Sequence, residues 1–166
     1  QLVEYDKKFL IIGNINAITY KEVFPLIKEN KLWLGYNCAR WFFTPDGNLF
    51  EAARSYWYTN LDTTKRHEKL TLYKKYSPNE YPKYGNYEAI EVSKVFDIPA
   101  DYEMVMGVPV TFLDKWNPDQ FEIIGMAEDN GKGMSGGIWD GKNPHCVVNG
   151  QNKFKRIFIK NKEPQK

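Results

Sequence analysis

Four polar side chains follow two apolar segments, at points where strands should end. Asn14 and Asn16 come just after residues 9–13 (FLIIG), and Tyr36 and Asn37 stand where the second segment, residues 31–36 (KLWLGY), ends. In open α/β sheets, ligands bind at the carboxyl ends of the strands. An Asn amide both donates and accepts hydrogen bonds, which suits recognition of the edge of a base. The alternative for Asn14 and Asn16 is that they cap the following helix.

A second group of candidate residues combines basic with aromatic side chains. Aromatic rings stack on unpaired bases while Lys and Arg meet phosphates, so such clusters suit nucleic-acid binding. The alternative is that each Trp or Phe packs in the core. The candidates for DNA contact are Arg40, Trp41, Arg54, Trp57, Lys65 and Arg66.

Other chemical motifs are weak. Residues 131–136 (GKGMSG) match the GxGxxG pattern, but Pro144 follows soon after and no helix can be drawn to present its N-terminus to a phosphate. A surface loop is therefore the favoured interpretation. The carboxylates are scattered, and His67 lies in a charged segment (KRHEK) that suits a turn or an exposed face better than a catalytic site.

Composition excludes several classes of protein. The chain has 166 residues, a net charge of +2 and 42% hydrophobic residues, which suits a folded domain. It has no apolar run long enough to span a membrane. Its two cysteines and two histidines form no CxxC or HExxH motif, so we expect neither a disulfide framework nor a metal site. Because no signal peptide opens the chain, a cytoplasmic location is expected.

The elements that position the polar residues begin with a βαβ pattern. Residues 9–13 form a continuous apolar run, typical of a strand covered on both faces. A short or kinked helix follows, with Thr19 and Glu22 as a capping box and Pro25 in its first turn. Residues 31–36 supply a second strand, parallel to the first. Residues 1–40 therefore predict part of an α/β, Rossmann-like sheet.

The rest of the chain, residues 41–166, is β-rich. The Asn149-Gly150 dipeptide lies between two β-rich runs, residues 145–148 and 154–159, and predicts a hairpin of these two runs. Residues 77–87 form a tyrosine-rich loop, and the polar tail from Asn161 should be frayed. We expect residues 1–166 to be one domain or a fragment of one, with further strands at residues 55–59, 69–74, 109–113 and 121–125.

Several segments together resemble the EcoRI-type adenine-specific DNA methyltransferases. They occur in the family's order along nearly the whole chain, and no single segment would be enough to identify the family. They are residues 9–22 (FLIIGNINAITYKE), 31–37 (KLWLGYN), 58–61 (YTNL), 106–113 (MGVPVTFL) and the closing hairpin with its LysArgIle sequence at 155–157.

The resemblance implies transfer of a methyl group from S-adenosylmethionine to adenine N6 in double-stranded DNA, with the adenine flipped out of the helix. The family's Asn-Pro-Pro-aromatic catalytic loop does not occur: residues 117–119 (NPD) and 143–145 (NPH) are the nearest strings. We therefore expect the C-terminal portion of a restriction–modification enzyme, without catalytic residues, inactive alone and unable to bind the cofactor alone.

Two other functions stay open at this stage. The chain could be a self-standing, non-catalytic nucleic-acid-binding domain, which would bind DNA with a steep salt dependence. It could also be a carbohydrate or small-ligand binder that uses its Trp and Tyr faces, whose binding would be insensitive to salt.

Overall fold

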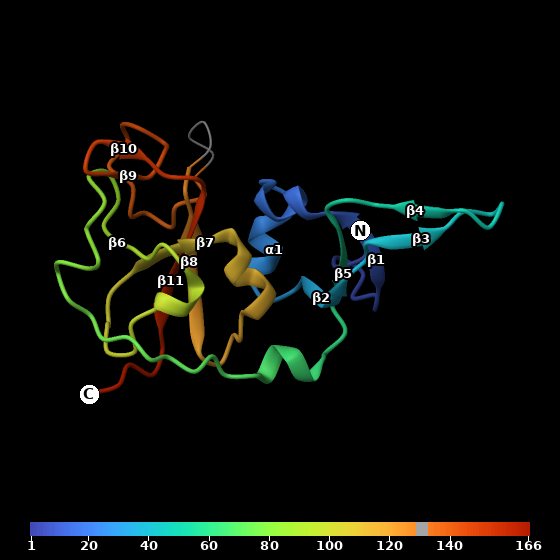
Figure 1. Cartoon of the computed structure of the whole chain (residues 1–166), viewed down its shortest axis with the longest axis horizontal. Helices are drawn as coiled ribbons and strands as arrows, with labels where there is room; N and C mark the ends of the chain where they lie inside the picture. Colours follow the sequence, from blue (N-terminus) through green and yellow to red (C-terminus); the bar gives the residue numbers. More distant parts are fainter. Residues whose placement is uncertain (129–132) are drawn as a thin grey trace. The chain divides into compact units, whose positions relative to one another are not determined.

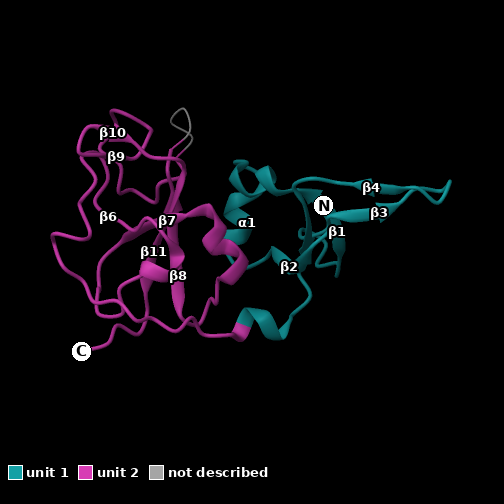
Figure 2. Ribbon diagram, in the orientation of Figure 1, with its two compact units in different colours: residues 1–66 teal, residues 67–166 magenta. Residues whose placement is uncertain are grey.

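The computed structural model describes residues 1–128 and 133–166. The chain divides into two compact units, residues 1–66 and residues 67–166, coloured separately in Figure 2. Unit 1 therefore contains residues 1–40, for which a βαβ unit was expected, together with some of the β-rich residues that follow them. None of the described helices is long and apolar enough to cross a membrane.

Unit 1 is built on a three-stranded sheet with the order β1-β5-β2 (Figure 1). The outer strands are β1 (Leu10–Asn14) and β2 (Trp33–Cys38), and β5 (Ser55–Thr59) lies between them. Both outer strands pair antiparallel with β5, so they run in the same direction without touching. The expected direct pairing of the two strands of a βαβ unit is therefore not found: the chain returns as a hairpin and inserts β5 between them.

The segment between β1 and β2 packs on one face of this sheet. The 3₁₀ helix η1 (Ile15–Thr19) is followed by the short α1 (Phe24–Lys28), which has Pro25 in its first turn as predicted. The predicted capping box is wrong, because α1 begins only at Phe24 and has no side-chain cap. The buried apolar residues of the unit include Ile18, Phe24, Ile27, Leu32, Leu34 and Tyr58.

Strand β1 differs from the expected covered strand. Leu10, Ile11 and Ile12 are 54%, 45% and 45% exposed, and β1 is an edge strand. Among the described residues, no strand pairs with the edge of β1 opposite β5. The apolar sequence alone therefore does not bury this strand, because burial on both faces needs packing neighbours that the described residues do not supply.

A two-stranded arm continues the β2–β5 hairpin beyond the sheet (Figure 1). Strands β3 (Trp41–Phe43) and β4 (Leu49–Glu51) pair antiparallel across the turn at residues 44–48. Four large hydrophobic side chains of the arm are more than half exposed: Trp41, Phe43, Leu49 and Phe50.

Unit 2 is built on a four-stranded sheet with the order β6-β7-β11-β8. Strand β6 is parallel to β7, and β11 is antiparallel to both of its neighbours. The 3₁₀ helices η3 (Val95–Asp97) and η4 (Val110–Lys115) follow β6 and β7, while η2 (Thr64–His67) joins the two units in sequence. The four strands are β6 (Ile90–Glu91), β7 (Met106–Pro109), β11 (Arg156–Asn161) and β8 (Phe121–Met126).

The predicted Asn149-Gly150 hairpin is confirmed. Strands β9 (Val147–Val148) and β10 (Gln151–Asn152) pair across this dipeptide, and both turn residues have positive φ, 50° and 77°. These angles are those of a type I′ turn, which Asn-Gly favours. Residues 154–159 were expected to be the second arm of this hairpin, but most of them instead form β11 in the larger sheet.

Three other expectations were wrong. Residues 69–74 form no strand and contribute only an isolated bridge at Lys74. Residues 110–113 lie in η4 instead of continuing β7. The polar tail is held down, because buried Asn161 donates to the Ala100 carbonyl and Lys69 pairs with Glu163 at 2.7 Å. These contacts join residues far apart in sequence, which local patterns do not reveal.

Candidate substrate rim of the first unit

The structure brings the four polar candidates to one edge of the unit 1 sheet. Strands β1 and β2 run in the same direction, so their carboxyl ends lie at the same edge. We call the exposed residues at these ends, Asn14, Asn16, Tyr36 and Asn37, the rim. The β3–β4 arm leaves the sheet at this same edge, between the end of β2 and the start of β5.

Asn14 has a structural role at the rim. Its side-chain oxygen accepts a 2.9 Å hydrogen bond from the Asn16 amide, which makes Asn14 the N-cap of η1. The Tyr58 hydroxyl donates to the Asn14 carbonyl at 2.9 Å, and burial raises the pKa of Tyr58 to about 12. Tyr58 is therefore protonated at neutral pH and fixes the end of β1. The capping alternative is confirmed for Asn14, while Asn16 lies inside η1.

Lys65 is brought to the rim from a distant part of the sequence. Its ammonium group donates to the Tyr36 carbonyl at 2.9 Å. The side chains of Tyr36 and Asn37 are exposed and make no hydrogen bond with the described residues. One predicted DNA contact and two predicted rim residues thus lie together, on η2 and β2.

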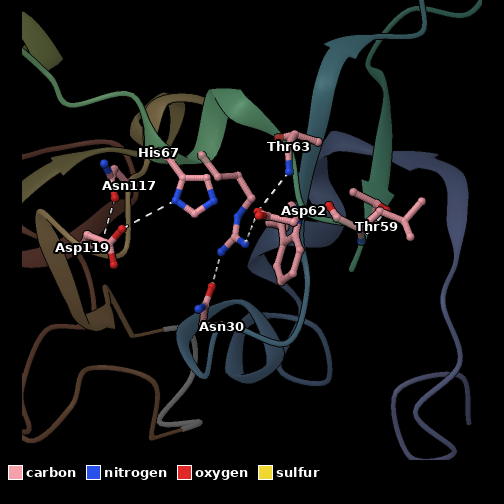
Figure 3. A network of polar contacts seen from close by, with 10 residues as sticks. Asn30, Thr59, Asp62, Thr63, His67, Asn117 and Asp119 are labelled. Atoms are coloured by element: carbon pink, nitrogen blue, oxygen red, sulfur yellow. Dashed lines mark hydrogen bonds and ion pairs between the residues drawn. The ribbon is translucent and has the colours of Figure 1, made fainter.

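Arg66, another predicted DNA contact, is held within unit 1 by contacts with Asn30 and Asp62, both labelled in Figure 3. Its guanidinium lies 3.4 Å from the centroid of the Trp33 ring, donates to the Asn30 side chain and pairs with Asp62 at 3.6 Å. The side chain is only 9% exposed. A buried guanidinium stacked on an aromatic ring stabilises the fold through cation–π attraction. Tertiary packing, which the KRHEK sequence did not indicate, decides this position.

The four remaining predicted DNA contacts are not gathered at one point. Arg40 donates to Glu51 at 2.8 Å across the base of the arm, and its guanidinium lies 5.7 Å from the exposed Trp41 ring. Arg54 is exposed where β4 returns to β5, with a positive φ of 65°. Trp57 is half-buried in the middle of β5. Their role in DNA contact stays a prediction.

In unit 2, His67 lies in an exposed polar turn, as its sequence context indicated. Its Nδ1 atom is 3.6 Å from the Asp119 carboxylate, and the Asp119 amide donates to the Asn117 side chain at 2.8 Å (Figure 3). Both charged side chains are exposed. Among the described residues, no group of three or more His, Cys, Asp or Glu could hold a metal ion.

The glycine-rich motif binds a carboxylate of its own chain. Gly131 and Lys132 lie outside the described residues. Beyond them, the Gly133 and Ser135 amides donate to Glu128 at 3.0 and 2.9 Å. Burial alone would raise the pKa of Glu128, but the hydrogen bonds from this loop outweigh it and lower the pKa. These two amides therefore already bind an anion, and residues 133–141 contain no helix that could support a phosphate site.

The sequence analysis missed a buried ionic cluster in unit 2. Arg156 binds the Glu91 carboxylate through two hydrogen bonds of 3.1 and 2.7 Å, and the Tyr84 hydroxyl donates to the same carboxylate. The Tyr84 side chain lies so close to Gly107 on β7 that a Cβ there would collide with it. All three polar residues are buried. Arg156 is 65 residues from Glu91 in the sequence, so no local pattern predicts the cluster.

Unit 1 also contains an apolar cavity of 470 Å³ on the face of the sheet that carries α1. S-adenosylmethionine carries a charged amino acid group, a ribose and a base, which all need hydrogen-bonding partners. The lining offers few polar groups, so the cavity does not fit this cofactor. Its lining residues include Phe9, Ile11, Gly13, Leu26, Leu32 and Tyr58.

The chain belongs to the EcoRI family of adenine-specific methyltransferases. The family model described as "Adenine-specific methyltransferase EcoRI" matches residues 1–162, which confirms the resemblance found in the sequence segments.

Three relatives extend this finding. The chain is 48% identical to the Type II methyltransferase M.EcoRI of Escherichia coli, over all of this chain and 54% of that protein. It is 39% identical to the Type II methyltransferase M.MpnI of Mycoplasma pneumoniae and 36% identical to M.MgeORF184P of Mycoplasma genitalium, over 74% of this chain and 45% of each relative. The chain spans about half the length of these curated relatives. No solved structure matches it significantly.

Proposed function

We propose that this chain is the C-terminal part of a restriction–modification methyltransferase that transfers a methyl group from S-adenosylmethionine to adenine N6 in DNA. The observation that carries the proposal is the family match over residues 1–162. The chain contains no Asn-Pro-Pro-aromatic sequence, and its apolar cavity does not fit the cofactor. The proposal therefore assigns catalysis and cofactor binding to the rest of the full-length enzyme.

Unit 1 supplies the final strands of the enzyme's Rossmann-like sheet in this proposal. Two features of the unit support it: β1 and β2 run parallel with a helical connection between them, and β1 has a free apolar edge. The carboxyl ends of parallel strands form the ligand-binding edge of such sheets. The rim would accordingly face the flipped adenine or the cofactor.

The positions of the rim residues predict which substitutions change substrate binding without destabilising the fold. Tyr36 and Asn37 are exposed, whereas Asn14 caps η1 and would destabilise the unit if changed. We expect Tyr36→Ala and Asn37→Ala in the full-length enzyme to lower methylation of DNA at least about tenfold, the effect of about 1.4 kcal/mol of lost binding or transition-state energy. Their unfolding midpoints should match that of the parent.

The control is Lys28→Ala, an exposed residue near the end of α1, which leads into the amino end of β2, away from the rim. It should methylate at the parent rate. The assay follows transfer of a tritiated methyl group to duplex DNA by the full-length enzyme and by the isolated chain. Methylation by the isolated chain would overturn the assignment of catalysis to the other part. Unchanged rates in both rim variants would remove the rim from the substrate site.

A salt titration of DNA binding separates this proposal from the non-catalytic alternative. If the isolated chain binds duplex DNA with the affinity and salt slope of the full-length enzyme, it is a self-sufficient DNA-binding domain. We expect the isolated chain to bind more weakly and with a shallower slope, because in this proposal the other part of the full-length enzyme supplies further contacts to the phosphates of DNA.

A further inference from the structure

The last part of unit 2 has a marked excess of positive charge. Residues 141–162 contain no Asp or Glu, and they contain six basic residues, whereas the net charge of the whole chain is only +2. Arg156 is neutralised by the buried Glu91, and the other five basic side chains are exposed or half-buried. The six are Lys142, Lys153, Lys155, Arg156, Lys160 and Lys162. This segment is therefore suited to a polyanionic partner.

The β9–β10 hairpin within this segment presents exposed amide side chains (Figure 1). Asn149, Gln151 and Asn152 are exposed, and their side chains make no hydrogen bond with the described residues. Val148, just before the turn, packs in the core of unit 2 and anchors the hairpin. A two-stranded ribbon fits the major groove of DNA, where Asn and Gln amides bind base edges. The hairpin thus has the shape and the chemistry of an element that reads bases.

Phe154 follows the hairpin as an exposed side chain on a fixed backbone. The ring is 76% exposed. The buried Arg156 donates to the Phe154 carbonyl at 3.0 Å, and the Lys153 amide donates to the Cys146 carbonyl at 2.7 Å. Arg156 is itself held by its two hydrogen bonds to Glu91. The buried ionic cluster therefore holds an apolar ring in solvent, and a fixed backbone lowers the entropy cost of binding through that ring.

The loop that leads into the hairpin is fixed as well. The buried Asn86 donates to the Asn143 and His145 carbonyls at 2.6 Å each and accepts from the first amide of β9 at 3.1 Å. Lys142 is exposed on this loop. Asp140, the nearest acidic residue before it, accepts from the Lys142 amide at 3.0 Å. The exposed polar groups of the hairpin therefore lie on a framework that needs little ordering when a partner binds.

We propose that residues 147–155, the β9–β10 hairpin with the three residues after it, read the DNA sequence around the target adenine from the major groove. Gln151 and Asn152 bind base edges through their amides. Phe154 packs on the C5-methyl group of a thymine, and Lys153 contacts a phosphate. The inference rests on the proposed function and adds the element that recognises the sequence. Charge and composition commit it to DNA, because the cores of protein interfaces are depleted in Lys.

Methylation of a pool of duplexes with random sequence tests the reading of bases by the full-length enzyme. The double variant Gln151→Ala/Asn152→Ala should lower the preference for the best sequence over single-base changes at least about fivefold, since each bidentate contact discriminates against the wrong base. Gln165→Ala is the control, because this amide is exposed in the C-terminal tail, and it should keep the parent's preference. A double variant that keeps the parent's preference, or that loses methylation equally at every sequence, would overturn the proposal.

Replacing thymine by uracil tests the contact of Phe154, because uracil lacks the C5-methyl group. The thymines of the preferred duplex are replaced one at a time, and binding by the full-length enzyme is measured. One replacement should weaken binding by the parent about fourfold, the effect of exposing one methyl-sized group. The same replacement should not affect binding by Phe154→Ala. Equal sensitivity of the parent and the variant to every uracil would contradict the contact.

The salt dependence of DNA binding tests the phosphate contact. Lys153→Ala should weaken binding to all duplexes alike and lower the salt slope by about one. Lys160→Ala is the matched control: this exposed lysine lies on β11 opposite Glu122 of β8, and its loss should leave the slope unchanged. An unchanged slope for Lys153→Ala would remove this residue from the interface. The urea midpoints of all these variants should match that of the parent, since their side chains are exposed or half-buried.

Binding measured without the cofactor separates this proposal from the proposed function. If the parent prefers one sequence in binding and the hairpin variants lose that preference while no adenine is methylated, only the proposed function is wrong. If the parent methylates adenine and the variants keep its sequence preference, only the reading role of the hairpin is wrong.

Discussion

Replacing Arg66 with Met distinguishes a structural role of this residue from the predicted contact with DNA. The guanidinium lies 3.4 Å from the Trp33 ring centroid, and the side chain is 9% exposed. A desolvated cation–π contact contributes about 2 kcal/mol. Met keeps an apolar side chain of similar length over the ring, and the exposed Asn30 and Asp62 regain water as a partner. We therefore expect the free energy of unfolding to fall by about 2 kcal/mol.

The assay is urea unfolding of the isolated chain, followed by tryptophan fluorescence and far-ultraviolet circular dichroism. With a slope of about 2 kcal/mol per molar urea, the midpoint should fall by about 1 M. Arg40→Met is the matched control, because its side chain is 63% exposed and pairs with Glu51 on the surface of the arm. Exposed ion pairs contribute about 0–1 kcal/mol, so its midpoint should move by less than half as much.

If Arg66 instead contacts a phosphate of DNA, the opposite result is expected. Arg66→Met would then keep the parent midpoint, and the salt dependence of DNA binding by the full-length enzyme would lose about one unit of slope. A midpoint for Arg66→Met equal to that of the parent would refute the reasoning from burial and stacking.

Two further predictions concern unit 2. Arg156→Met should lower the free energy of unfolding by about 3–5 kcal/mol, because it leaves the Glu91 carboxylate buried without its partner. The double variant Glu91→Met/Arg156→Met should recover most of this loss in urea unfolding, and a double variant as unstable as the single one would contradict the account. Burial raises the pKa of Cys146 from 9.0 to about 12, so its protonated form contributes stability below pH 9 that is lost as the pH rises toward 12. Cys146→Ala should therefore lose less stability than the parent between pH 7 and pH 10.5, and equal losses would show that this thiol does not contribute.

Much of the local structure could be predicted from the sequence. The Asn149-Gly150 turn, the strand at residues 55–59 and the short helix with Pro25 in its first turn depend on backbone preferences of a few neighbouring residues. The placement of Asn14 at a strand end also followed from local pattern, although its capping role needed the observed hydrogen bond to Asn16.

The candidate site could be predicted only in part. The rim residues follow two apolar runs in the sequence, but the approach of Lys65 to Tyr36 joins positions 29 residues apart. Arg66 looked like part of an exposed charged segment because its neighbours are all polar, and only packing against Trp33 shows that it is buried. Glu91 and Arg156 are 65 residues apart, so their pairing likewise cannot be predicted from local sequence patterns.

The sequence by itself determined the family, the turns and the apolar character of residues 9–13, because these depend on residue types and on neighbours along the chain. Tertiary structure alone decided that β5 separates β1 from β2, which charged residues are buried, and that β1 lies at an edge. The physical reason is that a strand's hydrogen-bonding neighbours and a charge's desolvation are set by contacts between distant segments. A strand can therefore have the apolar sequence of a sheet interior and still lie at an exposed edge, as β1 does.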